Sequence, residues 1–246
     1  DDKTVYVKGF FEGINDIILK IVDIIMRLAP YGVFALLASL VVDFGASTDL
    51  FIALGFYSIT VVVGLLLMIF FVYPFILRFF TKVRYSDFFK AISPAQMLAF
   101  STSSSAATLP VTMDRCENNL GVSKEVSSFV LPLGATINMD GTSLYQAVAA
   151  VFIGQAFGFD LDLTAQLTIV LTATLASIGA AAVPGAGMVV IVLSSVGIDP
   201  EGIALIFAVD RILDMLRTVV NVTGDATIAT VIAASEDQLQ ELNTED

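Results

Sequence analysis

The sequence contains no histidine and only one cysteine, Cys116, among its 246 residues. A single cysteine cannot form a disulfide within the chain, and it excludes a metal site built from cysteine ligands. Charged residues are also scarce, at 15% of the chain, and acidic residues outnumber basic ones by 24 to 12. This balance gives no support to a nucleic-acid partner. No signal peptide is visible, and because the sequence opens on Asp-Asp-Lys without a methionine, we expect it to be a piece of a longer protein.

Apolar residues are what the sequence has in abundance. They make up 57% of the chain, and the mean hydropathy is +0.87. Soluble domains hold about 45–50% apolar residues, and a helix needs ~20 of them to cross a bilayer. Several uncharged runs exceed that length. The sequence therefore predicts an all-α polytopic membrane protein that lies in a lipid bilayer.

The first two predicted helices are separated by a short acidic loop. Residues 1–50 should form an amphipathic start and a first transmembrane helix, with a kink at Pro30. Residues 51–80 form the next helix and open a core that runs to residue 234. Basic residues lie at the end of this helix and beyond it, and the positive-inside rule places them in the cytoplasm: Arg78, Lys82, Arg84 and Lys90. Residues 235–246 are an acidic tail that should be solvated.

Residues 91–113 are uncharged and long enough to cross the membrane once, yet basic residues flank both ends. If both flanks are cytoplasmic, the segment must enter the membrane and return, as a re-entrant helical hairpin does. Its middle, residues 101–110, is rich in serine and threonine. We expect the tip there, with a serine capping the N-terminus of the second half-helix.

Three further segments complete the core. Residues 126–157 cross outward, but Asn-Met-Asp-Gly-Thr at 138–142 should interrupt the helix, since Asn, Asp and Gly are poor helix formers. Residues 164–198 are too long for one span and short for two, and Val-Pro-Gly-Ala-Gly at 183–187 breaks them. Their flanks carry no basic residue, so this second hairpin enters from outside. Residues 203–234 return inward, which leaves the C-terminus cytoplasmic in a multi-pass protein of the cell membrane.

Two oppositely oriented re-entrant hairpins, with interrupted and polar helices between and after them, indicate an inverted repeat whose broken helices meet at mid-membrane. Unwound backbone at that depth is tolerated only where it lines a cavity or packs within protein. The N-termini of half-helices carry partial positive charge, which suits an anionic substrate, and the freed carbonyls suit a hard cation such as Na⁺.

The last helix carries a polar stripe. At about 100° per residue, six polar side chains fall within an arc of roughly 100°: Asp210, Asp214, Arg217, Thr218, Asn221 and Asp225. Ionisable groups at bilayer depth cost at least ~2.5–3.5 kcal/mol each and usually serve a function. The alternative is a structural ion-pair network between Asp214 and Arg217.

The charges at membrane depth do not balance. Four acids, Asp140 and those at 210, 214 and 225, stand against Arg211 and Arg217, which leaves two negative charges uncompensated. Bound cations or protonated carboxyls would restore the balance. Because carboxylates and carbonyls are supplied without imidazoles or thiolates, a hard ion is favoured over a transition metal.

Four motifs, in this order, carry a resemblance. They are Ser-Ser-Ser-Ala-Ala-Thr-Leu-Pro at 103–110, Leu-Gly-Ala-Thr-Ile-Asn-Met-Asp-Gly-Thr at 133–142, Ser-Ile-Gly-Ala-Ala-Ala-Val-Pro-Gly-Ala-Gly at 177–187, and Asp-Met-Leu-Arg-Thr-Val-Val-Asn-Val-Thr-Gly-Asp at 214–225. Over about residues 11–234 the chain resembles the sodium-coupled glutamate/aspartate transporter family, in its C-terminal half. The resemblance implies sodium-coupled symport of L-aspartate or L-glutamate by an elevator-like alternating-access mechanism. It also implies a homotrimer of the full-length protein.

The resemblance also implies a substrate site. Arg217 clamps the side-chain carboxylate, because a guanidinium fork fits a carboxylate bidentately. Asp214 holds the ammonium, and Thr218 and Asn221 complete the head-group contacts. The remaining members cap or line the pocket from the first hairpin tip, the interrupted helix and an extracellular gate in the second hairpin: Ser103, Ser105, Thr142, Val183 and Gly187.

Three sodium sites are implied in the same way. The first uses carbonyls of Gly134, Asn138 and Asn221 with the Asp225 carboxylate. The second uses carbonyls of Thr136, Ser177, Ile178 and Ala180. The third uses Asn138 and Asp140, together with ligands from an upstream helix that is not in this sequence.

Three positions depart from the family pattern. An auxiliary arginine is usual at one of two places that hold Ser103 and Met215 here. Gln146 stands where potassium-exchanging, proton-carrying members have a glutamate, which argues against such coupling.

Other functions remain open beside this one. Sodium-coupled transport of neutral amino acids or dicarboxylates is the nearest, and Arg217 argues against a neutral substrate. An intramembrane aspartyl protease could pair Asp225 with Asp140, but it leaves Arg217 and the hairpins without a role. An ion channel would pass current without stoichiometric uptake. We expect a transporter and not an enzyme.

Overall fold

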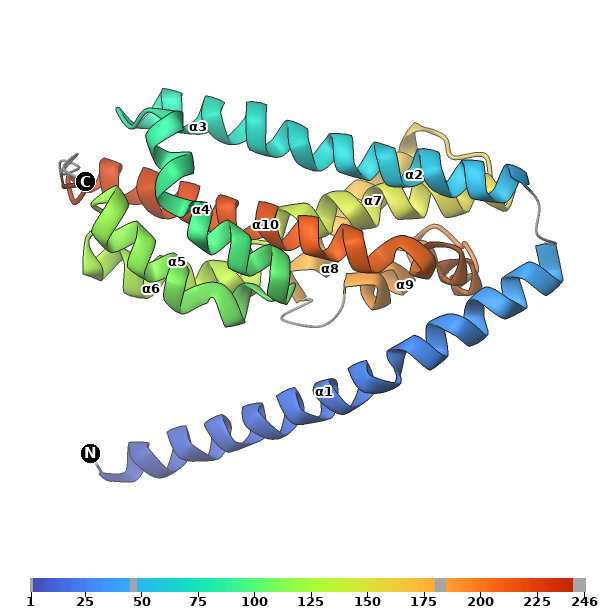
Figure 1. The fold of residues 1–246 in the computed structure, drawn as a ribbon, viewed down its shortest axis with the longest axis horizontal. Coiled ribbons are helices and arrows are strands. Elements are labelled where there is room, and N and C mark those ends of the chain that lie inside the picture. Colours follow the sequence, from blue (N-terminus) through green and yellow to red (C-terminus); the bar gives the residue numbers. More distant parts are fainter. Residues whose placement is uncertain (1, 45–47, 180–184, 241–246) are drawn as a thin grey trace. The chain divides into compact units, whose positions relative to one another are not determined.

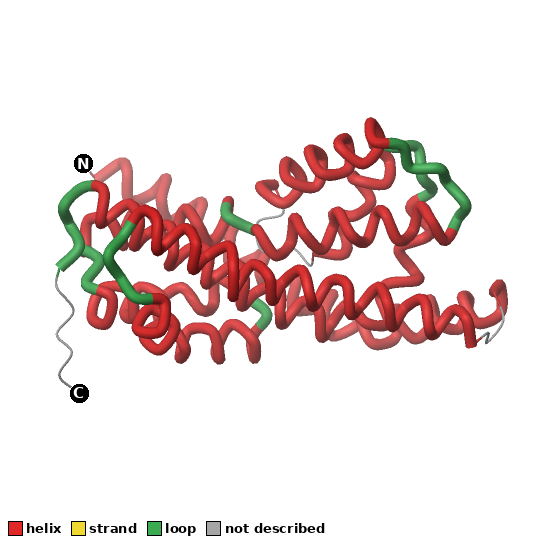
Figure 2. The backbone as a smooth tube through the Cα atoms, turned by 90° about the horizontal axis from the view of Figure 1, so that it is seen from above, coloured by secondary structure: helices red, strands yellow, loops and turns green. Residues whose placement is uncertain are grey.

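Every regular element in residues 2–44, 48–179 and 185–240, the part that the computed structural model describes, is a helix, as Figures 1 and 2 show. The only strand-like feature there is an isolated antiparallel bridge between Val122 and Leu239. The all-α prediction is confirmed. The chain divides into two units, Asp1–Ser47 and Thr48–Asp246, which are described separately.

The first unit is one long helix, α1 (Asp2–Phe44), with Pro30 inside it. It starts at the beginning of the 1–50 segment, because residues 2–11 contain no proline and only one glycine that would disfavour a helix.

The second unit opens on a nearly continuous helical run: α2 (Thr48–Leu67), a π-helical turn η1 (Met68–Val72) and α3 (Tyr73–Phe80). Pro74 follows the π-helical turn at the start of α3, where its missing N–H and its ring interrupt the regular hydrogen-bond pattern of the helix. Two helical stretches among the described residues are long and apolar enough to cross a membrane, Phe51–Phe80 and Val209–Ser235.

The first hairpin has its tip where the sequence predicted. Helices α4 (Tyr85–Thr102) and α5 (Ser105–Leu120) pack against each other and meet at Ser103 and Ser104. Ser103 takes the left-handed conformation with φ 51°. The hydroxyl of Ser104 accepts a hydrogen bond from the Ala107 N–H at 3.2 Å, which confirms the expected serine cap.

The interrupted helix is also observed. It consists of α6 (Lys124–Ile137) and α7 (Asp140–Ala156), with the break at Asn138 and Met139. Helices α8 (Leu163–Gly179) and α9 (Gly185–Ser195) follow and pack against each other. The expected second tip lies at residues 180–184, outside the described residues.

Helix α10 (Ala204–Ser235), preceded by a 3₁₀ turn (Pro200–Ile203), is the centre of this unit. It packs against α2, α3, α4, α5, α6, α7 and α9, and Figure 1 shows it running through the unit in red-orange. Small residues let neighbours approach it: Ala226, Ala229 and Ala233 are fully buried in one apolar cluster. Thr227 and Thr230 are buried beside them and donate to backbone carbonyls four residues earlier.

The acidic tail begins close to the core. The Gln238 side chain accepts from the Ser123 hydroxyl at 2.6 Å, and the Gln240 N–H donates to the Gly121 carbonyl at 2.8 Å. Leu239 packs on the apolar cluster. The first residues of the tail are therefore tied to the α5–α6 link, while Glu236 and Asp237 are exposed.

Candidate functional site

Arg217 is the most buried charged residue of the polar stripe, with 1% of its surface exposed. Its Nη1 donates to Asp210 at 3.0 Å and its Nη2 to Asp214 at 2.6 Å. Both carboxylates lie nearer the surface, with side-chain exposures of 14% and 25%. The guanidinium is thus held from one side by two acids, one and two turns earlier on the same helix.

The other side of Arg217 faces an aromatic ring. Its guanidinium carbon lies 3.7 Å from the ring centroid of Tyr145 on α7. Such a stack is worth about 2 kcal/mol or more when it is desolvated. Within the described residues, the buried Nε of Arg217 has no hydrogen-bond partner. One donor of the guanidinium is therefore not used by the described part of the chain.

Asn221 joins α10 to the broken helix. Its side-chain oxygen accepts from the Gly141 N–H at 2.8 Å, and its amide nitrogen donates to the Thr142 hydroxyl at 3.2 Å. A Cβ at Gly141 would lie 2.7 Å from the Arg217 carbonyl oxygen, so the start of α7 approaches α10 only because this residue is glycine. The predicted members Thr142, Arg217 and Asn221 are brought together here.

The Thr218 hydroxyl donates to the Asp214 carbonyl at 2.9 Å. It continues the polar stripe one turn beyond that acid.

Asp225 lies one turn beyond Asn221 and is 97% buried, with 3% exposed. Its carboxylate accepts from the Asn138 amide at 2.9 Å. Helix α6 comes so close that a Cβ at Gly134 would lie 2.6 Å from Asp225 Oδ1. Three residues of the first implied sodium site, Gly134, Asn138 and Asp225, are therefore in one place.

Asp140 lies on the other side of the same junction. The Tyr73 hydroxyl is 3.0 Å from Asp140 Oδ2 and 3.1 Å from the Val220 carbonyl oxygen. A Cβ at Gly224 would lie within 3.0 Å of Asp140, Tyr73 and Asn138. Within the described residues, neither Asp140 nor Asp225 forms an ion pair.

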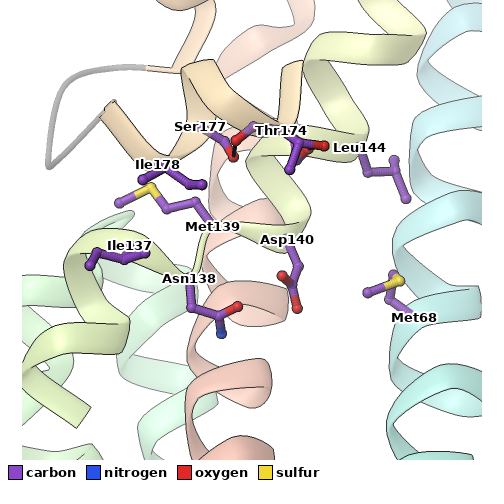
Figure 3. Close-up of a pocket in the computed structure, with 10 residues that line it drawn as sticks. Met68, Ile137, Asn138, Met139, Asp140, Leu144, Thr174, Ser177 and Ile178 are labelled. Atoms are coloured by element: carbon purple, nitrogen blue, oxygen red, sulfur yellow. Dashed lines mark hydrogen bonds between the residues drawn. The ribbon is translucent and has the colours of Figure 1, made fainter. Parts of the chain in front are cut away.

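A cavity of about 520 Å³ opens beside Asp140. Its lining includes Asn138 and Asp140 from the break, Ser177 and Ile178 from the end of α8, and Met68 from η1. In Figure 3, Met68 points toward Asp140 from the opposite wall, while Ser177 and Ile178 lie above the break. The cavity thus borders residues of both the second and the third implied sodium sites.

The other predicted residues lie farther out or outside the described chain. Ser105 is buried at the first tip, and the Ser103 hydroxyl is buried without a partner among the described residues. The Thr136 hydroxyl bonds carbonyls of its own helix, and Gly187 is exposed in α9. Ala180 and Val183 lie outside the described residues.

Comparison with known proteins identifies the family of this chain. The sequence model of the sodium:dicarboxylate symporter family matches residues 1–235. The chain belongs to this family. Its members are transporters by description, so the aspartyl-protease alternative gains no support, and a place in the membrane is implied for this chain.

Several known transporters are similar to this chain over most of its length. Human excitatory amino acid transporter 5 is 45% identical over 227 residues, covering 92% of this chain and 40% of the relative. Mouse excitatory amino acid transporter 1 is 45% identical over 228 residues, covering 92% and 42%. Rat excitatory amino acid transporter 4 is 46% identical over 228 residues, covering 92% and 41%. The chain therefore spans about two fifths of the length of these relatives.

Two residues of the site were missed from the sequence. Tyr145 and Tyr73 lie in apolar runs, where the sequence predicts that an aromatic residue belongs to the core or faces lipid. A buried tyrosine hydroxyl usually finds a polar partner, and that rule was the one available signal. Arg211, counted as a balancing charge, is exposed and forms no ion pair within the described residues, so it pairs with none of the four acids there.

Proposed function

We propose that this chain holds the substrate and ion sites of a secondary active transporter that couples sodium entry to the uptake of an acidic amino acid, aspartate or glutamate. The observation that carries the proposal is the arrangement around Arg217. A buried guanidinium with an unused donor lies within hydrogen-bond distance of an acid, Asp214, that is still partly exposed.

An acidic amino acid fits this arrangement by exchange. Its side-chain carboxylate takes a place on the guanidinium, and its ammonium takes the carboxylate of Asp214, so one internal ion pair is replaced by two with the substrate. Thr142, Thr218 and Asn221 supply the neutral hydrogen-bonding groups nearby. A neutral amino acid leaves the guanidinium without its carboxylate, and a dicarboxylate leaves Asp214 without an ammonium.

Sodium belongs to the second part of the proposal. Asp140 and Asp225 are drawn together at the helix break with only neutral donors for partners. Burying such charges uncompensated is costly, and a hard cation bound by carboxylate and carbonyl oxygens offsets that cost. Because Asn138 and Asn221 connect this region to the start of α7, an ion here orders the substrate pocket.

The finer expectations stay with this proposal. They are a multi-pass protein of the cell membrane, a cytoplasmic C-terminus, re-entrant hairpins, an elevator-like movement and a homotrimer in the full-length protein. The basic residues that follow α3 support the orientation by the positive-inside rule.

The test is uptake of labelled aspartate by the full-length protein in liposomes, with sodium or choline outside. We expect uptake only with sodium, and competition by unlabelled glutamate but not by serine or succinate. Competition by serine as strong as by glutamate would favour a neutral-amino-acid transporter. Competition by succinate alone would favour a dicarboxylate transporter.

A further inference from the structure

A second cavity, of about 530 Å³, lies at the end of the first apolar span of the second unit, away from the site described above. One wall is aromatic and consists of Phe70, Phe71 and Phe75. The rim is basic and consists of Arg78, Lys82 and Arg84. We call this cavity the aromatic–basic groove.

The aromatic wall belongs to a helix suited to the bilayer. Phe70, Phe71 and Phe75 are 56%, 68% and 69% exposed, and they lie within the apolar run Phe51–Phe80. Large aromatic side chains exposed near the end of a span suit contact with acyl chains and the interface. This wall therefore presents an apolar surface to the upper part of a lipid tail.

The rim carries more positive charge than its neighbours neutralise. Arg84 pairs with Asp87 at 2.8 Å. Within the described residues, Arg78 and Lys82 form neither an ion pair nor a hydrogen bond. Two unpartnered cations next to an apolar wall match a lipid with a net negative headgroup, whereas a zwitterionic headgroup brings its own positive charge.

The groove is held in shape by hydrogen bonds below its rim. The Tyr85 hydroxyl, at the start of α4, donates to the Ile69 carbonyl of the π-helical turn at 2.5 Å. The Thr81 hydroxyl donates to the Leu77 carbonyl at 2.7 Å and accepts from the Val83 N–H at 3.2 Å. The turn that carries the cations is thus fixed against the aromatic wall.

We propose that the aromatic–basic groove binds one anionic phospholipid, with its phosphate between Arg78 and Lys82 and the first part of an acyl chain along Phe71 and Phe75. The charge excess selects the headgroup, and the aromatic wall selects a lipid over a soluble phosphate. This binding is separate from the transport proposal and stands if the substrate is different.

The experiment uses the full-length protein, purified in detergent and titrated with phosphatidylglycerol or phosphatidylcholine of identical chains under native mass spectrometry. We expect phosphatidylglycerol to bind more tightly. The double variant Arg78→Gln, Lys82→Gln should weaken it by about 30-fold, at about 1 kcal/mol per cation, and bring it to the level of phosphatidylcholine.

The matched control is Arg115→Gln, Lys124→Gln, which removes two charges from the α5–α6 region outside the groove. It should keep the preference for phosphatidylglycerol. Equal binding of the two lipids by the unaltered protein, or an equal loss in both double variants, would overturn the proposal.

Two further measurements distinguish a bound lipid from other occupants of the groove. Phe71→Ala should weaken both lipids several-fold, and inorganic phosphate at millimolar concentration should not displace phosphatidylglycerol. Displacement by phosphate would make this a soluble-anion site and contradict the proposal. If another part of the full-length protein or a second copy fills the groove, neither lipid will bind there and Phe71→Cys will resist a lipid-soluble thiol reagent, which also contradicts it.

Discussion

Two pairs of carboxylates lie along the same helix bundle, and they are compensated in different ways. Asp210 and Asp214 share the guanidinium of Arg217. Asp140 and Asp225 receive only neutral donors, the hydroxyl of Tyr73 and the amide of Asn138. The first pair resembles a structural ion-pair network, whereas no cationic side chain among the described residues pairs with the second.

This difference is why we propose a different ligand for each region. The four carboxylates are balanced by a single buried guanidinium, that of Arg217, because Arg211 is exposed. At the Arg217 region an acidic amino acid brings both a carboxylate for the guanidinium and an ammonium for Asp214, so it can replace the internal ion pair. At the Asp140–Asp225 region only added positive charge restores the balance. In the proposed function, substrate and cation thus have separate places, which Asn138 and Asn221 connect to the start of α7.

The largest effect should come from Arg217→Cys, which removes the only compensation in the first region. We expect aspartate affinity to fall by at least about 100-fold, since charged hydrogen bonds contribute roughly 1.5–3 kcal/mol each. Weak binding of serine or alanine should appear, because Asp214 still holds an ammonium. Calorimetric titration of the full-length variant measures both. Arg211→Cys removes an exposed arginine of the same helix and should bind aspartate normally; unchanged affinity in Arg217→Cys sinks the assignment.

Asp225→Asn makes the second region less negative while it keeps the size of the side chain. We expect the sodium concentration for half-maximal aspartate binding to rise by about tenfold or more, with affinity largely recovered at high sodium. Aspartate titrations at several sodium concentrations measure this shift. Asp160→Asn, at an exposed acid beyond α7, is the control and should leave the curve in place. If the curves of Asp225→Asn and the unaltered protein superimpose, Asp225 is structural.

Tyr73→Phe removes the neutral donor that faces Asp140 and sharpens the comparison further. Without that hydroxyl the ion-free form loses about 1 kcal/mol, and bound sodium replaces part of the loss. The rise in melting temperature on adding sodium should therefore be larger in this variant than in the unaltered protein. Tyr85→Phe loses a hydroxyl bond to a backbone carbonyl elsewhere, so its rise should be unchanged. An equal rise in all three proteins contradicts a cation at Asp140.

The smallest effect is expected from internal potassium. Gln146 is fully buried on α7, and neither of its amide atoms has a hydrogen-bond partner within the described residues. An amide is uncharged at every relevant pH, so it joins neither carboxylate region and cannot alternate between a proton and a cation. Counter-transport in liposomes should proceed at the same rate with internal potassium or choline. A clear stimulation by potassium would falsify this expectation.

Much of the fold follows from the sequence, because short polar residues inside apolar runs mark the breaks. Ser103–Ser104 and Asn138–Met139 interrupt the helices where turn chemistry and low helix propensity predicted. The stripe on α10 also followed from helical periodicity. The second tip, with Ala180 and Val183, stays a prediction.

The rest of the site depends on packing between distant segments. The Tyr73 hydroxyl meets Asp140 across 67 residues of sequence, and Tyr145 reaches Arg217 only because glycine at 141 lets α7 approach α10. Arg211 was counted by depth alone, although it is exposed and forms no ion pair within the described residues. Local sequence patterns predict how deep a residue lies in the membrane and on which face of its helix, but they do not predict which other helix packs against that face.

The central claim is that a cation in the Asp140–Asp225 region prepares the Arg217 region for substrate. Its most direct test is linkage in the unaltered full-length protein: aspartate affinity measured at low and high sodium, and sodium affinity measured with and without aspartate. Coupling between two sites is reciprocal, so the two factors must agree. We predict that sodium tightens aspartate strongly and that aspartate tightens sodium by the same factor, with choline ineffective. Aspartate affinity that is the same in sodium and in choline would contradict the account.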